Sequence, residues 1–214
     1  DVLGKNVKAK ADVELHFKRT AGQGFVFNVE VDGEALERAN KPIRINMPYK
    51  PTQLEMQKTH NIVVKRIDNL QAVIVPNARF NENSKAVILE TNHFGQYHIE
   101  YVSKSFADIA TYDWAKGAIE GLAARDVIQG TGENQFAPER AVTRAEFITM
   151  LVRALDLQAQ RGETSFTDVN QDAYYYEPLN VAKDLGIVQG TGDNRFNPNA
   201  HIARQDLFTM TARA

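Results

Sequence analysis

The chain has 214 residues, a formal net charge of -2 and no cysteine. This length is enough for two domains, and the absence of cysteine excludes a disulfide framework and a thiolate metal site. No apolar run is long enough for a membrane span, and the sequence starts without a signal peptide. We therefore expect a piece of a longer protein.

The character of the sequence changes near Ser103. Before it, apolar and polar residues alternate as in β-strands, and after it apolar residues recur at helical spacing between glycine-rich loops. Residues 1–104 contain 15 basic and 12 acidic residues, whereas residues 105–214 contain 10 basic and 15 acidic residues. The acidic C-terminal part lacks the basic clusters that attract nucleic acid or anionic lipid. The sequence predicts a β domain followed by a helical domain and no nucleic-acid partner.

The N-terminal part contains about seven short alternating segments separated by turn signals. In the first, the apolar side chains of Val7, Ala9, Ala11, Val13, Leu15 and Phe17 share one face, which predicts a half-buried strand. The others are residues 25–31, 43–47, 62–67, 72–75, 86–90 and 97–102. This pattern predicts an all-β sandwich of Ig-like size.

Four histidines of this part raise the question of a metal site: His16, His60, His93 and His98. They lie on different segments, with no ligand spacing on a shared helix or hairpin. We therefore expect no metal and no cofactor. No nucleophile lies beside a base in the sequence, so this part alone predicts no function.

The C-terminal part contains an internal repeat. Residues 105–154 align with 165–214 without a gap, and 15 of these 50 positions are identical. A glycine loop lies at the same place in both copies, with the residues Gly130, Thr131 and Gly132 and their counterparts Gly190, Thr191 and Gly192. Such repeats bury their apolar faces against one another, so the function is expected between the copies.

Each copy predicts two helices. In the first copy, Asp113 is expected to cap a helix that ends near Arg125. Thr143 and Glu146 predict a capping box for the second helix. Its expected buried face consists of Phe147, Met150, Leu151, Ala154 and Leu155.

Other repeated residues have structural interpretations. Pro178 predicts that the first helix of the second copy begins late. Asp108 and Asp168 are expected to accept hydrogen bonds from local backbone amides. The expected core phenylalanines are Phe106, Phe136, Phe166 and Phe196.

Arg144 lies in the first turn of its helix, where the helix dipole disfavours a cation. It is therefore either paired with Glu146 or a neighbouring carboxylate, or a contact to a ligand. The second copy keeps this arginine as Arg204 and a carboxylate as Asp206, although Ala203 replaces the threonine cap.

The order of these motifs resembles the S-layer homology repeat of bacterial cell-envelope proteins. Thr143-Arg144-Ala145-Glu146 is identical to the signature tetrapeptide of that family, and the resemblance covers about residues 105 to 214. It implies a multidomain chain in which a β-sandwich module in residues 1–103 precedes all-α repeats in 104–160 and 161–214. The repeats would form an incomplete pseudo-threefold bundle.

The resemblance also implies a function. The chain would be no enzyme but a secreted surface protein of a Gram-positive bacterium, anchored to the cell wall. Its ligand would be secondary cell-wall polysaccharide, a glycan linked to peptidoglycan and often carrying a pyruvate ketal, bound in a groove between repeats. The resemblance implies that Arg144 and Arg204 contact the carboxylate of the ligand. The full set of expected ligand-binding residues is Arg144, Glu146, Arg204, Asp206, Gly130, Thr131, Gly132, Gly190, Thr191, Gly192, Trp114 and Tyr174.

Several alternatives stand beside this interpretation. The family usually has three repeats, so the third has been removed by truncation, which we favour, or another chain supplies it. A calcium-binding loop at residues 191–194 is a second alternative, but the sequence there lacks the alternate oxygen ligands and the following bidentate glutamate that such a loop needs. A glycoside hydrolase would need an acid and a base that nothing singles out. A protein-assembly module of a surface layer remains as the alternative function.

Overall fold

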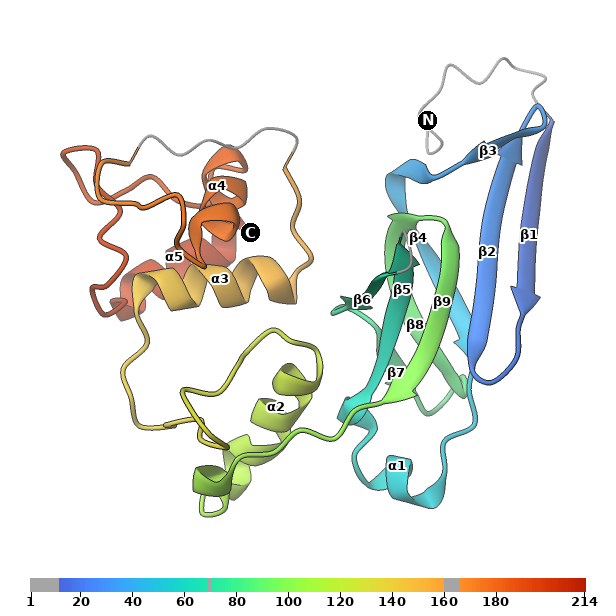
Figure 1. Cartoon of the computed structure of the whole chain (residues 1–214), viewed down its shortest axis with the longest axis horizontal. Coiled ribbons are helices and arrows are strands. Elements are labelled where there is room, and N and C mark those ends of the chain that lie inside the picture. Colours follow the sequence, from blue (N-terminus) through green and yellow to red (C-terminus); the bar gives the residue numbers. More distant parts are fainter. Residues whose placement is uncertain (1–11, 69–70, 160–165) are drawn as a thin grey trace. The chain divides into compact units, whose positions relative to one another are not determined.

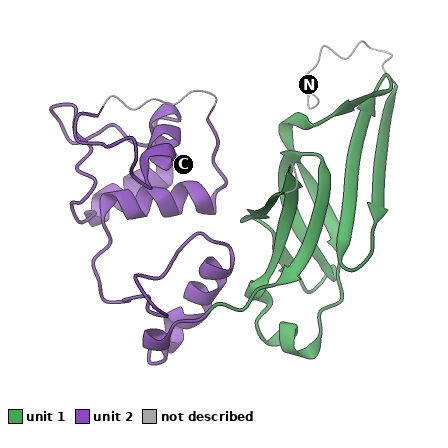
Figure 2. Cartoon of the chain, in the orientation of Figure 1, with its two compact units in different colours: residues 1–104 green, residues 105–214 purple. Residues whose placement is uncertain are grey.

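The structure is a computed structural model that describes residues 12–68, 71–159 and 166–214. The chain divides into two compact units, Asp1–Lys104 and Ser105–Ala214 (Figure 2). The first unit contains the β-strands and the second contains the longer helices (Figure 1). Each unit is described separately below.

In the described residues of the first unit, the strands form two open sheets. The larger sheet has the order β1-β2-β9-β5-β6, with β3 paired to β2, and the smaller has the order β4-β8-β7. The larger sheet consists of β1 (Val13–Arg19), β2 (Gly24–Val31), β3 (Glu34–Leu36), β5 (Ile62–Asp68), β6 (Gln71–Val75) and β9 (Gly95–Tyr101). The smaller consists of β4 (Arg38–Pro48), β7 (Arg79–Asn81) and β8 (Ala86–His93), and a short helix α1 (Gln53–Gln57) follows β4.

One buried cluster takes side chains from both sheets. Phe25, Val64 and Tyr97 come from the larger sheet, and Met47 and Leu89 come from the smaller. The alternation of apolar residues along these strands places them on one face of each sheet. The two open sheets therefore share a hydrophobic core.

The sequence predicted most of these strands but not the environment of the first. Val13, Leu15 and Phe17 are exposed rather than half-buried, because β1 is an edge strand that pairs with β2 alone in the described sheet. Val7, Ala9 and Ala11 lie outside the described residues. The short strands β3 and β7 and the helix α1 were not predicted, although Thr52 and Glu55 form a capping box at α1.

In the described residues of the second unit, each repeat has two α-helices, as predicted. They are α2 (Asp113–Ala124) and α3 (Arg144–Ala154) in the first repeat, and α4 (Tyr176–Asp184) and α5 (Arg204–Arg213) in the second. α4 begins three positions after the counterpart of Asp113, which confirms the effect expected of Pro178. In the part of the chain that the structure describes, none of the helices has the length and apolar character needed to cross a membrane.

The helix caps confirm one prediction and correct another. At α3, the Thr143 hydroxyl accepts from the Glu146 amide at 3.2 Å, and the Glu146 carboxylate accepts from the Thr143 amide at 2.9 Å. At α2, the N-cap is Tyr112 without a side-chain hydrogen bond, and Asp113 is the first helical residue. The carboxylate of Asp113 still favours that end of the helix through the dipole.

Helix α3 lies between two apolar clusters. Met150 and Ala154 pack on the cluster of the first repeat, which includes Ile109 and Ile119. The opposite side belongs to the cluster of the second repeat, with Leu179 and Phe196. The most buried residues of α3 are therefore Arg144, Ala145, Ile148, Thr149 and Val152, and not the stripe expected from the sequence.

Candidate functional site

An aspartate fixes the glycine loop of each repeat. The Asp108 carboxylate accepts from the backbone amides of Phe136 at 2.9 Å and Ala137 at 2.6 Å. Asp168 accepts from Phe196 at 2.9 Å and Asn197 at 2.8 Å. This confirms that the two aspartates bind backbone amides, but their partners are 28 and 29 residues away and not local. The hydrogen bond from the Phe136 amide lowers the pKa of Asp108.

The first glycine of each loop is required by close packing. A Cβ atom at Gly130 would lie 2.5 Å from the Gln135 carbonyl oxygen and 2.8 Å from the Phe106 ring. At Gly190 it would meet the Phe166 ring at 2.8 Å. A Cβ at Gly132 would have nothing within 4 Å. Gly130 and Gly190 therefore allow a phenylalanine ring to pack directly on the loop.

Arg144 joins the two repeats. Its side chain is only 6% exposed; its Nε donates to the Phe196 carbonyl at 2.9 Å, and its guanidinium forms an ion pair with Asp206. The guanidinium also lies over the Phe196 ring, 5.0 Å from the ring centre. Arg144 therefore pairs with a carboxylate, as one expectation had it, but its partner is Asp206 of the second repeat and not Glu146, and its burial leaves little of the guanidinium accessible to a ligand.

The partner of Glu146 is Arg140, which the sequence analysis did not single out. Two guanidinium nitrogens of Arg140 donate to the Glu146 carboxylate at 2.6 and 3.2 Å. Burial raises the pKa of Glu146, but the hydrogen bonds from Arg140 and from the Thr143 amide lower it by more. This bidentate pair is the strong form of an arginine–carboxylate contact.

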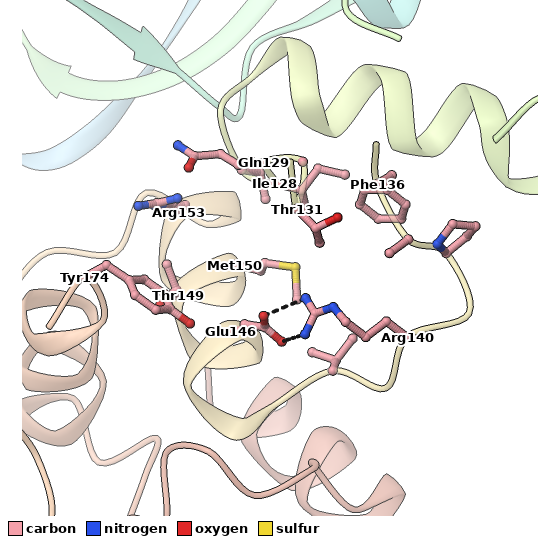
Figure 3. Close-up of a pocket in the computed structure, with 15 residues that line it drawn as sticks. Ile128, Gln129, Thr131, Phe136, Arg140, Glu146, Thr149, Met150, Arg153 and Tyr174 are labelled. Atoms are coloured by element: carbon pink, nitrogen blue, oxygen red, sulfur yellow. Dashed lines mark hydrogen bonds and ion pairs between the residues drawn. The ribbon is translucent and has the colours of Figure 1, made fainter. Parts of the chain in front are cut away.

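Beside this pair is a pocket of about 540 Å³ (Figure 3). The loop after α2 contributes Gln129, Gly130 and Thr131 to its lining, and α3 contributes Thr149 and Arg153. Tyr174, from the second repeat, completes the lining. The pocket is therefore shared by the two repeats.

Arg153 and Tyr174 give the pocket a cation and an aromatic ring. Figure 3 shows both on the same side of the pocket as Gln129, away from Arg140. Among the residues that the structure describes, Arg153 has no carboxylate within ion-pair distance. Tyr174 is 60% exposed. The pocket can therefore offer guanidinium donors and a ring face to an incoming ligand.

The structure places only some of the expected ligand residues at this pocket. Gly130, Thr131, Glu146 and Tyr174 line it. Trp114 is 88% exposed and lies outside its lining. Also outside are Gly132, Arg144, Gly190, Thr191, Gly192, Arg204 and Asp206. The sequence analysis did not single out the lining residues Gln129, Arg140, Thr149 and Arg153, although the repetition of Arg153 as Arg213 was a usable signal.

Two helical repeats that pack through an arginine and share an open pocket define a repeat module with a candidate binding site at its surface. Comparison with known proteins names this module: the S-layer homology domain matches residues 105–148 and 165–208. The second unit therefore carries two S-layer homology domains.

Relatives of the chain include enzymes and surface-layer proteins. It is 33% identical over 136 residues to an amylopullulanase of Thermoanaerobacterium thermosulfurigenes, covering 64% of this chain and 7% of the relative. It is 38% identical over 103 residues to endo-1,4-beta-xylanase A of Thermoanaerobacterium saccharolyticum, covering 48% of this chain and 9% of the relative. It is 36% identical over 101 residues to the surface-layer 125 kDa protein of Lysinibacillus sphaericus, covering 47% of this chain and 8% of the relative.

The chain thus spans less than a tenth of the length of these three relatives. The matching domains and the surface-layer relatives associate the protein with the cell wall and the cell surface.

Proposed function

We propose that the chain anchors its parent protein to the cell wall by binding secondary cell-wall polysaccharide in the pocket between the two repeats. The observation that carries this proposal is that Arg153 and the exposed ring of Tyr174 both line a shared pocket of about 540 Å³. A guanidinium offers paired donors to the carboxylate of an acidic or pyruvylated sugar. An aromatic ring provides a flat apolar face for the sugar ring.

The other repeated residues have supporting roles in this proposal. Arg144 and Asp206 hold the second repeat where Tyr174 can reach the pocket. Glu146 holds Arg140 at the wall of the pocket and reduces the net charge of that wall. Thr131 and Gln129 supply polar groups for sugar hydroxyls. The proposal assigns no catalytic step to the chain.

The test is retention of the chain on purified wall sacculi before and after acid removal of the polymer. We expect retention only when the polymer is present, and a loss of about tenfold or more in affinity for Arg153→Ala and Tyr174→Ala. The repeat provides matched controls, since Arg213 and Trp114 occupy the same repeat positions and lie outside the pocket lining. Arg213→Ala and Trp114→Ala should retain binding; equal losses in both pairs would contradict this location of the site.

We also propose that a third repeat unit covers α5 and completes a pseudo-threefold bundle. Ile148 of α3 is fully buried by the second repeat, whereas its counterpart Phe208 on α5 is 59% exposed. Arg144 is buried, and its counterpart Arg204 is exposed. A third unit would form a second groove, in which Gly190 and Thr191 take the places of Gly130 and Thr131. In the first unit, the two open sheets would form a sandwich module.

The same exposed face supports the alternative function, a protein-assembly module of a surface layer. In that case, copies of the chain would pair through Phe208 of α5. Sedimentation velocity at increasing concentration distinguishes the two: a concentration-dependent dimer that Phe208→Ser abolishes favours assembly. A monomer at all concentrations that still binds sacculi favours anchoring.

A further inference from the structure

The edge of the larger sheet carries a cluster of potential metal ligands. Glu14 and His16 lie on β1, and Glu30 lies on β2. One carboxylate oxygen of each glutamate and one ring nitrogen of His16 all lie within 4.8 Å of one another. Glu14 and Glu30 are direct partners in the antiparallel register, and His16 is two residues from Glu14 on the same face.

The charges around this cluster favour a cation. Two carboxylates directly opposite each other in neighbouring strands repel and destabilise the pair. The next rung adds Asp12 and Asp32, joined by a hydrogen bond of 3.0 Å from the Asp12 amide to the Asp32 carboxylate. On the same face, Lys18 follows two residues after His16 and is the nearest cation along β1. Among the described residues 12–19 and 24–32, the four carboxylates of these two rungs outnumber the single lysine on the same face.

The geometry and the ligand types indicate which cation fits. The Nε2 atom of His16 lies 3.3 Å from a carboxylate oxygen of Glu14. Two ligand atoms of a tetrahedral zinc site with bonds of about 2.0–2.1 Å are separated by about 3.3–3.4 Å, so this pair already has the spacing of one edge. Glu30 needs only side-chain rotation to close the set. Calcium and magnesium prefer oxygen ligands, whereas imidazole suits zinc and its neighbours.

We propose that Glu14, His16 and Glu30 bind a divalent first-row transition metal ion, with Zn²⁺ as the expected occupant, and that the ion fastens the edge strand β1 to β2. β1 is exposed along its whole length, and in the described sheet it pairs only with β2. Its position therefore depends on that single ladder of backbone hydrogen bonds. Three protein ligands on two strands add a second link, and water completes the coordination.

The test is a titration of the untagged, metal-stripped chain with ZnCl₂, CoCl₂ and CaCl₂ by calorimetry. We expect saturable binding of one Zn²⁺, and binding weaker by about tenfold or more in His16→Asn and Glu30→Gln. The matched controls are His98→Asn on β9 and Glu90→Gln on β8, which are exposed residues of the same unit outside the cluster. Both should bind Zn²⁺ as the unsubstituted chain does. Because all four positions are at least partly accessible, circular dichroism should show the same fold in each variant.

A second readout tests the structural role. Zn²⁺ should slow amide hydrogen exchange in β1 and β2 of the unsubstituted chain and of His98→Asn, but not of His16→Asn. Zinc binding that is absent below millimolar concentration, or unchanged in His16→Asn, overturns the proposal. Calcium binding as tight as zinc binding and independent of His16 also overturns it, since it would indicate only a general attraction of cations to carboxylates.

Discussion

At the scale of single residues, the side chain of Arg144 links the two repeats. Its guanidinium donates to the Phe196 carbonyl, pairs with Asp206 and covers the Phe196 ring. Removing the side chain would leave the carbonyl of the fully buried Phe196 without its donor, together with the Asp206 carboxylate, whose side chain is 37% exposed. The loss at the carbonyl costs more than the favourable contact alone contributes, because the carbonyl stays desolvated.

The first prediction concerns this link. Arg144→Ala should lower the free energy of unfolding by about 2–4 kcal/mol, measured by urea unfolding followed through the helical circular dichroism signal. Arg204→Ala, at the exposed counterpart, should change it by less than about 0.5 kcal/mol. An Arg144→Ala variant that is as stable as the unsubstituted chain but no longer binds sacculi would instead restore a direct ligand contact for Arg144.

The second prediction concerns the glycine loops. Gly130→Ala should destabilise the chain by about 1–3 kcal/mol, because the added methyl group meets the Gln135 carbonyl and the Phe106 ring. Gly132→Ala, where the methyl group has free space, should change the unfolding midpoint little. Thermal unfolding of the two variants side by side tests this. Equal effects would mean that the loop can shift to accept a side chain at Gly130.

At the scale of elements, each repeat is closed by its aspartate. Asp108 and Asp168 connect the start of a repeat to the loop that precedes its second helix. At Asp108 the amide of Phe136 is the main cause of the lowered pKa; at Asp168 burial raises the pKa, but the amides of Phe196 and Asn197 lower it by more. The charged form of both carboxylates is therefore favoured by folding.

The third prediction follows from the sign of these shifts. Because the pKa of each carboxyl in the folded state is below its ordinary value of 3.8, both contribute stability above that pH. This contribution is lost as the pH falls below 3.8 through the lowered values. Asp108→Asn plus Asp168→Asn should be less stable at neutral pH and should lose less stability on acidification. Parallel curves of unfolding free energy against pH for both proteins would contradict this account.

The helices and most strands could be predicted because their signals are local. The capping box at Thr143 and the alternation in β2 lie within a few residues of sequence. The environment of Arg144 could not be predicted in this way, because its partners follow 52 and 62 residues later. For the same reason, the place of Arg153 in the pocket could not be predicted, because the ring of Tyr174 joins the lining only through the packing of the second repeat.

At the scale of the whole molecule, the two units have separate cores. The clusters around Tyr97 and Val29 consist of residues before Lys104, and those around Ile109 and Leu179 of residues after Ser105. Each core is built within its own unit, so each unit has the basis to fold cooperatively by itself.

The fourth prediction is that the units unfold independently. Calorimetry of the full chain should show two transitions, and Arg144→Ala should lower only the one that loses the helical signal. Addition of Zn²⁺ should raise only the other. A single transition that shifts as a whole with either change would show that the units are coupled.

The central claim is that the anchoring polymer binds in the pocket between the repeats. An NMR titration of the ¹⁵N-labelled chain with solubilised wall polymer tests this most directly. We expect the largest amide shifts at Gln129, Thr131, Thr149, Arg153 and Tyr174, and we expect Arg153→Ala to remove them. Shifts confined to α5 or to the β-sheet unit, with the pocket resonances unchanged, would contradict it.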